Sequence, residues 1–296
     1  NADLELLHQP GKISHAKGKL TLDGIQYPPL PAGSSLRAKE LDLDFVWREG
    51  GQFKTVVRKF ELQLADAGQK PLAHWTGSGD WDPFTGGFNL ALEPGEMSQP
   101  LLQSLLAKKL GEAKIASGKV SNPKALKISR GEEGNWLAEG SITIENLLIN
   151  DSGGRFPSEA MAAQLQLKTG WSVSGAHWYA VLWPSTVAIQ LGNRPAGTAN
   201  VMGFYSSEKS EGNIDARLAD VNHRVVNLLP ERWRRGVQLR AGKIVNLKTK
   251  GELKNHTLTG SLKLDLRGAD IVEPSGWWPI GPLDVTHELA GTFSLG

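Results

Sequence analysis

Strict alternation of apolar and polar residues is the feature of this sequence that most restricts its fold. Leu41, Leu43 and Phe45 alternate with Asp42 and Asp44. Because successive side chains of a β-strand point to opposite faces, this pattern predicts a strand with one apolar and one polar face. The same spacing recurs along the chain, in segments 60–64, 88–92, 141–145, 165–168, 187–191, 214–218, 245–248 and 261–266.

Amphipathic strands of this kind are typical of antiparallel sheets, since parallel sheets are buried on both faces and have continuous apolar runs. Glycine pairs, for example Gly86 with Gly87 and Gly153 with Gly154, separate the candidate strands as turns do. We therefore expect a mainly β chain, with a long, curled antiparallel sheet of about fifteen strands.

Two segments depart from the alternation and predict short helices. The first begins at Ser98 or Gln99, has Pro100 in its first turn and stops at Gly111. The second is expected over residues 219–229. The leucines of the first segment have helical spacing, at positions 101, 102, 105, 106 and 110.

The length of 296 residues suits one large all-β domain or two ordinary ones. We expect residues 1–296 to be a single elongated β segment of a longer chain, with a weak internal boundary near 151–157. The first residues contain neither a signal peptide nor a membrane anchor. Any anchor or export signal is therefore expected to lie outside this segment.

The composition argues against several classes of protein. Lys and Arg number 33 against 31 Asp and Glu, and a nucleic-acid binder normally has a clear basic excess. The absence of cysteine excludes a disulfide scaffold, a thiolate metal site and a cysteine nucleophile. None of the seven histidines lies in an HExxH motif, so the sequence predicts neither a metal site nor a cofactor.

Nucleotide-binding and hydrolase motifs are also missing from the sequence. It has neither a Walker A loop nor a G-x-S-x-G elbow. Gly77 and Gly79 form a GxG-like piece that we place between strands, without the helix that a dinucleotide site needs.

Two pairs of carboxylates are the closest candidates for acid–base catalysis. Asp42 and Asp44 are predicted to face solvent, on the side of their strand opposite the apolar residues. Asp80 and Asp82 flank Trp81 in a predicted turn. We interpret both pairs as structural, and we predict a protein without catalytic residues.

The ten tryptophans are unusual for a chain of this length. They can fill a core, stack on sugars or line a lipid site. Trp277 and Trp278, in a loop between candidate strands, are the aromatic pair predicted to make exposed contacts. The basic residues of segment 232–235 are interpreted as a solvated helix end, with contact to anionic headgroups as the alternative.

So many amphipathic strands must hide their apolar faces. They can pack as a closed sandwich or barrel, which is the commoner solution, or curl into a groove that needs an apolar occupant. The alternation alone does not separate these two architectures.

Three segments resemble the AsmA-like superfamily of bridge-like lipid transfer proteins. Residues 140–150 (GSITIENLLIN) and 260–270 (GSLKLDLRGAD) resemble its layered strands. Residues 220–236 (DVNHRVVNLLPERWRRG) are similar to its short helix, followed by proline and glycine before a new run of strands. The resemblance is one of pattern and covers most of the chain.

This resemblance implies a taco-shaped β-groove in the periplasm of a Gram-negative envelope, anchored in the inner membrane through a part outside this segment. It implies movement of phospholipids to the outer membrane, with acyl chains and the envelope membranes as partners and without nucleic acid, cofactor or catalysis. The residues expected to line such a groove are Leu41, Leu43, Phe45, Leu62, Leu64, Phe88, Leu90, Leu92, Ile142, Ile144, Leu165, Leu167, Val187, Ile189, Leu262, Leu264 and Leu266.

Two other functions fit the same sequence. The tryptophans and the Asp80/Asp82 pair fit an all-β carbohydrate-binding or glycan-active protein. A fully packed envelope scaffold, such as an adhesin domain, fits the strand pattern without any ligand.

Overall fold

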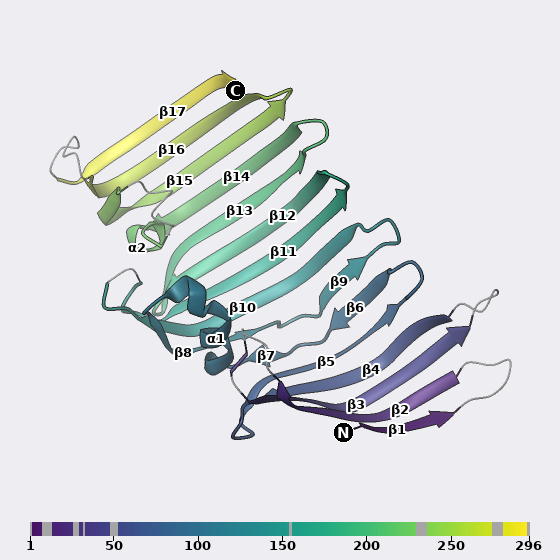
Figure 1. The fold of residues 1–296 in the computed structure, drawn as a ribbon. Helices are drawn as coiled ribbons and strands as arrows, with labels where there is room; N and C mark the ends of the chain where they lie inside the picture. The colour runs from purple at the N-terminus through teal and green to yellow at the C-terminus, as the bar shows by residue number, and fades with distance from the viewer. Residues whose placement is uncertain are drawn as a thin grey trace. The chain divides into compact units, whose positions relative to one another are not determined.

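The computed structural model describes residues 2–7, 14–25, 30–31, 33–47, 53–153, 156–228, 236–273 and 281–294. In these residues the chain is mainly β, with seventeen strands that pair antiparallel and two short helices (Figure 1). The predicted fold class is therefore confirmed. The chain divides into two compact units, an N-terminal unit, Asn1–Asn150, and a C-terminal unit, Asp151–Gly296.

The N-terminal unit contains ten strands and helix α1 (Gln99–Leu110). Strands β1 to β5 are a simple meander, and α1 lies between β7 and β8 in the sequence. The strands are β1 (Ala2–Leu7), β2 (Ser14–Ile25), β3 (Ser34–Trp47), β4 (Phe53–Ala65), β5 (Pro71–Trp81), β6 (Phe88–Leu92), β7 (Glu96–Met97), β8 (Lys114–Ser121), β9 (Leu126–Arg130) and β10 (Trp136–Asn150).

Between β5 and β10, two strand positions of this sheet are each occupied by two short strands instead of one long strand. Strands β6 and β7 both pair with β5, and β8 and β9 both pair with β10. Strand β6 pairs with β9, and β7 pairs with β8. The break between β6 and β7 therefore lies opposite the break between β8 and β9.

The side chain of Asn122 joins the two breaks. Its Oδ1 accepts a hydrogen bond from the Gly95 N–H at 2.9 Å. Its Nδ2 donates to the carbonyl oxygens of Leu92, Glu93 and Lys124, at 3.2, 2.8 and 3.3 Å. One amide thus satisfies backbone groups that the interrupted ladders leave without a strand partner.

The C-terminal unit is a sequential antiparallel meander, in which each strand pairs with the next one along the chain. Its helix α2 (His223–Val226) lies between β14 and β15. The strands are β11 (Met161–Ser174), β12 (His177–Leu191), β13 (Arg194–Ser206), β14 (Glu211–Asn222), β15 (Gln238–Lys254), β16 (Thr257–Val272) and β17 (Leu283–Ser294).

The cross-strand register defines one common face in each unit, because directly opposite residues point to the same side of a sheet. In the N-terminal unit, one row across the strands is Leu43, Val57, Gly79, Leu90 and Ile128. We call the side of each unit that carries such rows the apolar face, and the opposite side the polar face. In the C-terminal unit the corresponding row is Leu165, Val187, Ala199, Leu218, Leu247 and Leu264.

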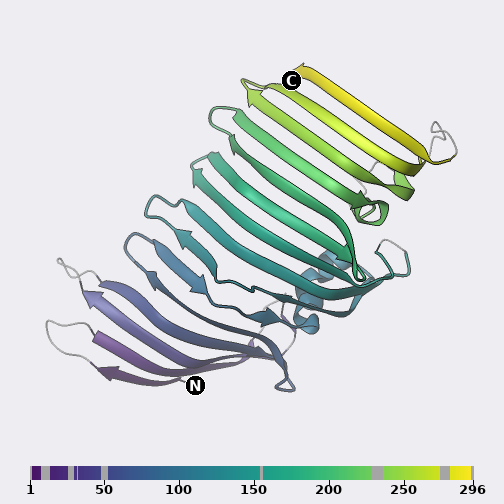
Figure 2. The same cartoon turned by 180° about the vertical axis from the view of Figure 1, so that it is seen from behind.

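In each unit the described strands form one layer (Figures 1 and 2). The closed sandwich, the commoner architecture for such strands, is therefore not formed by the described strands of either unit. Each unit covers only one end of its apolar face, and it does so with its helix.

Helix α1 covers one end of the apolar face of the N-terminal unit. Its Leu101 is buried with Leu64 of β4 and with Leu72 and Ala73 of β5. Two glutamines of α1 fasten the helix to β8: Gln99 Nε2 donates to the carbonyl oxygen of Ile115, and Gln103 Oε1 accepts from the Ile115 N–H at 2.6 Å. In the C-terminal unit, Val226 of α2 packs against a small core of Leu239, Leu266 and Ala269.

The first predicted helix agrees with the structure in its position. Pro100 lies in the first turn, and Gly111 ends the helix with a φ of 62° while its N–H donates to the Ala107 carbonyl oxygen. The side chain of Ser98 makes no cap hydrogen bond, although the residue occupies the cap position.

The second predicted helix begins too early. Residues 219–222 belong to strand β14, where Ala219 pairs with Asn246 and Val221 with Ile244. Helix α2 starts after Asn222, whose side chain caps it by accepting from the Arg224 N–H at 2.9 Å. The ladder with β15 overrides the local helical spacing of this segment.

The GxG piece lies inside strand β5 rather than between strands. A side chain at Gly77 would lie 2.3 Å from the Ala91 carbonyl oxygen, and one at Gly79 equally close to that of Asn89. Glycine is required here because β6 approaches β5 too closely for a Cβ atom.

We expect Asn122→Ala to lower the free energy of unfolding by about 1–3 kcal/mol, because it leaves the backbone groups at both breaks without their partner. Urea denaturation measures this change. Asn135→Ala, at an exposed position in the β9–β10 turn, is the matched control. Equal stability of the two variants would contradict the role of Asn122.

Candidate functional site

The apolar face of the N-terminal unit contains all the lining residues predicted in that half of the chain. Leu43 lies opposite Val57, Leu41 opposite Phe60, and Leu62 opposite Trp75. The register and the alternation along each strand place the following on this face: Leu41, Leu43 and Phe45 of β3, Leu62 and Leu64 of β4, Phe88, Leu90 and Leu92 of β6, and Ile142 and Ile144 of β10.

The apolar face of the C-terminal unit likewise contains the predicted residues of β11, β12 and β16. Leu165 lies opposite Val187, and Leu264 lies opposite Leu247. Ile189, Leu262 and Leu266 share this face by register and alternation. Leu167 lies within a register shift of β11 and is exposed.

The apolar faces also contain residues that the sequence analysis did not predict as lining. Phe60 and Trp75 lie between predicted positions in the N-terminal unit. Leu218 and Leu247 do so in the C-terminal unit. Leu218 and Leu247 belong to alternating segments, so their spacing in the sequence could have identified them as lining residues. Trp75 could not be identified in this way, because only the strand register brings it opposite Leu62.

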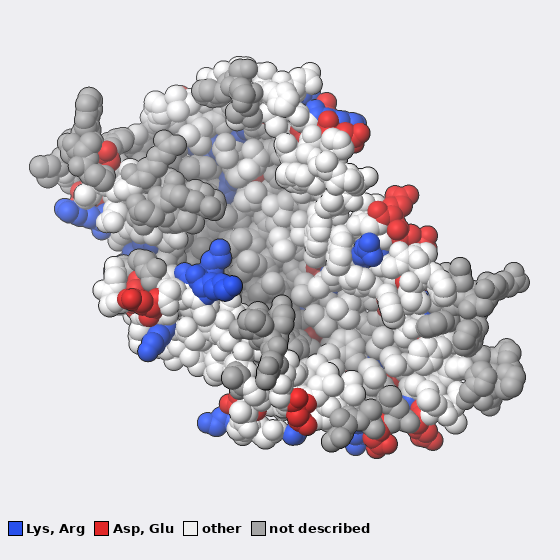
Figure 3. Space-filling view, in the orientation of Figure 1, with Lys and Arg blue, Asp and Glu red and all other residues white. Residues whose placement is uncertain are grey.

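Much of both apolar faces remains accessible. Ile214 and Leu289, on the apolar face of the C-terminal unit, are about half exposed. Figure 3 shows the side of the N-terminal unit on which α1 packs: uncharged side chains occupy its hollowed middle, and charged side chains lie mainly along its margins. An accessible apolar surface of this extent is characteristic of an interaction site.

The polar faces carry cross-strand ion pairs. In the N-terminal unit, Glu40 accepts a hydrogen bond from Lys59 and lies 3.9 Å from the Lys17 ammonium. The hydrogen bond from Lys59 lowers the pKa of Glu40, and the same contact raises the pKa of Lys59. In the C-terminal unit, Lys263 pairs with Glu288 at 3.4 Å in the same way.

The least exposed of these ion pairs involves Asp44. The His15 Nδ1 lies 2.9 Å from Asp44 Oδ1 and 3.6 Å from Asp42 Oδ1, while Arg58 Nε donates to Asp44 Oδ2. Burial raises the pKa of Asp44, but the hydrogen bonds from His15 and Arg58 outweigh this effect and hold its pKa below the ordinary 3.8. Sequence reasoning missed this cluster, because only the β2–β3 register brings His15 to Asp44.

The same cluster is the group of His, Asp and Glu side chains in the described residues that could hold a metal ion. The ligand atoms of His15, Asp42 and Asp44 lie within 4.8 Å of one another. The Arg58 guanidinium already forms an ion pair with Asp44. A metal ion bound to Asp44 would have to replace part of this contact. We therefore assign the cluster a structural role.

The structure separates the roles of Asp80 and Asp82. Asp80 lies on the polar face and pairs with Lys54 at 2.8 Å. Asp82 is buried and shapes the β5–β6 turn, where its Oδ1 accepts from the Phe84 N–H at 3.0 Å and its backbone bonds to Gly86 and Gly87. Asp80 therefore makes a contact between strands, and Asp82 stabilises the turn that follows β5.

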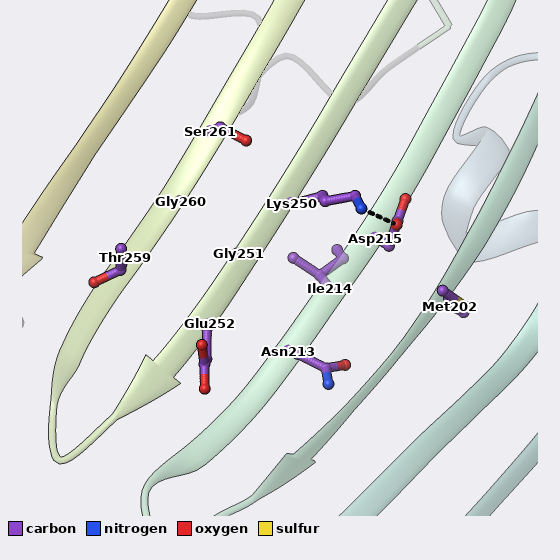
Figure 4. A pocket seen from close by; sticks show the side chains of 10 residues that line it. All are labelled: Met202, Asn213, Ile214, Asp215, Lys250, Gly251, Glu252, Thr259, Gly260 and Ser261. Carbon is purple, nitrogen blue, oxygen red and sulfur yellow. Dashed lines mark ion pairs between the residues drawn. The ribbon is translucent and has the colours of Figure 1, made fainter.

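An open depression of about 680 Å³ lies over strands β13 to β16 (Figure 4). An ion pair of 3.4 Å between Lys250 and Asp215 spans part of it. Most of its lining residues lie on the polar face by register, and Ile214, Gly251 and Gly260 lie on the apolar face. They are Met202, Asn213, Ile214, Asp215, Lys250, Gly251, Glu252, Thr259, Gly260 and Ser261.

The predicted aromatic contact at Trp277 and Trp278 lies outside the described residues. So does the basic segment 232–235. Among the described tryptophans, Trp81, Trp171, Trp178 and Trp183 are exposed by a third to a half.

Comparison with protein-family models, with curated proteins and with solved structures found no match. Among the described residues, no helix has the combination of length and apolar character that is needed to span a bilayer. The geometry of the two faces is therefore the basis for a functional assignment.

We expect Asp44→Asn to lower the free energy of unfolding by about 1–3 kcal/mol at pH 7, because it weakens the hydrogen bonds of a buried carboxylate to His15 and to the exposed Arg58. The pKa of Asp44 is lower in the folded state, so ionised Asp44 stabilises the fold above its unfolded pKa of about 4. This stabilisation is lost as the pH falls through the folded pKa.

Urea denaturation of wild type and Asp44→Asn at pH 7 and pH 3 tests this expectation. The difference between the two proteins should be smaller at pH 3. Asp23→Asn, at an exposed position near the end of β2, is the control. A difference that does not change with pH would rule out the ion pair as its cause.

Proposed function

We propose that the apolar faces bind the acyl chains of phospholipids and allow them to move along the protein, without enzymatic chemistry. The observation that carries this proposal is an apolar face in each unit that the described strands leave without a second layer. In each unit, the helix of that unit covers only one end of the apolar face.

The chemistry of the faces suits acyl chains. An acyl chain gains roughly 25 cal/mol for each Å² of apolar surface that it buries, and it needs no directional bonds. Rows such as Leu218, Leu247 and Leu264 present similar side chains on successive strands. Many similar weak contacts favour movement, whereas a single tight pocket favours retention.

The pairing of charges supports the same proposal. Cross-strand contacts such as Lys17 with Glu40 and Lys263 with Glu288 neutralise charge on the polar faces. Uncompensated charge among the apolar side chains would oppose acyl binding, because its desolvation is costly.

The finer assignment in this proposal rests on the resemblance of segments 140–150, 220–236 and 260–270 to the AsmA-like superfamily. By that resemblance, the chain is one length of a periplasmic groove that carries phospholipids between the inner and outer membranes. An anchor in the inner membrane would belong to a part of the protein outside this segment.

We expect Leu262→Asp to weaken binding of a fluorescent fatty acid by about tenfold, because a carboxylate replaces apolar contact area on the face. Ser261→Asp adds the same charge one residue away, on the polar face, and should bind the probe as the wild type does. Leu262 is preferable to Leu264, because Leu264 also packs against the core around Leu266.

Ile144→Asp and Thr143→Asp form the equivalent pair in the N-terminal unit. Fluorescence titration in the absence of membranes measures all four variants. Equal loss of binding in the two members of a pair, or no binding by wild type, would rule out the proposal. In that case an envelope scaffold or a glycan-binding domain would become the better assignment.

A further inference from the structure

The β11–β12 hairpin ends in exposed aromatic and aliphatic side chains. Val173 is 65% exposed, Trp178 48% and Tyr179 41%. Large apolar side chains grouped at one end of a sheet mark an interaction site. We call this group the hairpin-end surface; its members are Trp171, Val173, Trp178, Tyr179, Phe204 and Tyr205.

The hairpin-end surface is apolar on both faces of the sheet. On the apolar face, Val173 lies opposite Trp178, whose ring centroid is 4.6 Å from that of Tyr205. On the polar face, the ring of Tyr179 lies 6.3 Å from that of Phe204. The alternation that separates the two faces elsewhere in the unit is therefore lost at this end.

The sequence around the hairpin contains no charge. No Lys, Arg, Asp or Glu occurs from residue 169 to residue 193, although such residues make up 22% of the chain. The neighbouring β13–β14 turn carries one residue of each sign, Glu208 and Lys209. The hairpin and the turn beside it thus carry no net charge.

The backbone at this end is also paired. The Trp178 N–H donates to Ser207 Oγ at 2.7 Å, and the Trp178 carbonyl oxygen accepts from the Ser207 N–H at 2.9 Å. Unpaired backbone groups oppose entry into lipid, so these bonds lower the cost of leaving water.

We propose that the hairpin-end surface enters the interfacial region of a phospholipid bilayer. A bilayer surrounds an inserted element, which accounts for apolar side chains on both faces, whereas a docked protein normally covers one face. Trp and Tyr favour the membrane interface, because one part of each ring is apolar and the other is polar. The neutral surface matches a zwitterionic headgroup layer.

A sugar is a poorer fit to the β11–β12 hairpin itself. Stacked sugars need polar side chains beside the aromatic rings to bind their hydroxyl groups. Between Trp171 and Tyr179, the polar side chains are Ser172, Ser174 and His177. The segment contains no amide, carboxylate or guanidinium side chain for this purpose.

Sedimentation with phosphatidylcholine vesicles tests the proposal. The double variant Tyr179→Ser with Phe204→Ser, at the two aromatic positions on the polar face, should lower the partition coefficient by about tenfold. Met202→Ser, at a similarly exposed position on the polar face of β13, should partition as wild type does. Because the surface is neutral, binding should change little between low and high salt.

The same variants separate this proposal from acyl-chain binding. The double variant should still bind the fluorescent fatty acid in the absence of vesicles, which also shows that it is folded. Failure of wild type to bind vesicles, or equal binding by wild type and the double variant, would overturn the membrane contact. So would binding that requires anionic lipid and low salt, or an oligosaccharide that binds wild type and not the double variant.

Discussion

The constraint on which the rest of this structure depends is the alternation of side chains along single-layer strands. A sheet that packs on a second layer hides its apolar residues within the protein. Here the described strands leave the middle of each apolar face without a second layer, and the short helices α1 and α2 cover one end each. The division of chemistry between the faces follows, with ion pairs such as Lys263 with Glu288 on one side and rows of leucine on the other.

The charged side of the sheet contributes to stability in addition to the small cores under the helices. Asp44 shows how this works: burial alone would raise its pKa, and the contacts from His15 and Arg58 reverse that effect. Such a cluster stabilises the register between neighbouring strands, since a shift by one residue would move every charge to the apolar face.

The strands and their faces were predictable from sequence because alternation is a local property. Leu41, Leu43 and Phe45 could be assigned to one face without knowing which strands lie beside them. Features that depend on pairing were not predictable: β14 extends through residues 219–222 because β15 supplies a ladder, and Gly77 lies within β5 because β6 comes close. The meeting of His15 with Asp44 depends in the same way on the β2–β3 register.

Because each strand of the C-terminal unit pairs with its immediate neighbours in the sequence, the unit resembles a repeat protein in its energetics. Its stability is then close to a sum over adjacent strand pairs. Such a sheet is not limited in length by the volume of a core, so hairpins can be added or lost during evolution while the remaining strands keep their contacts. Unfolding would then begin by fraying at an outer strand, with the interior of the meander opening last.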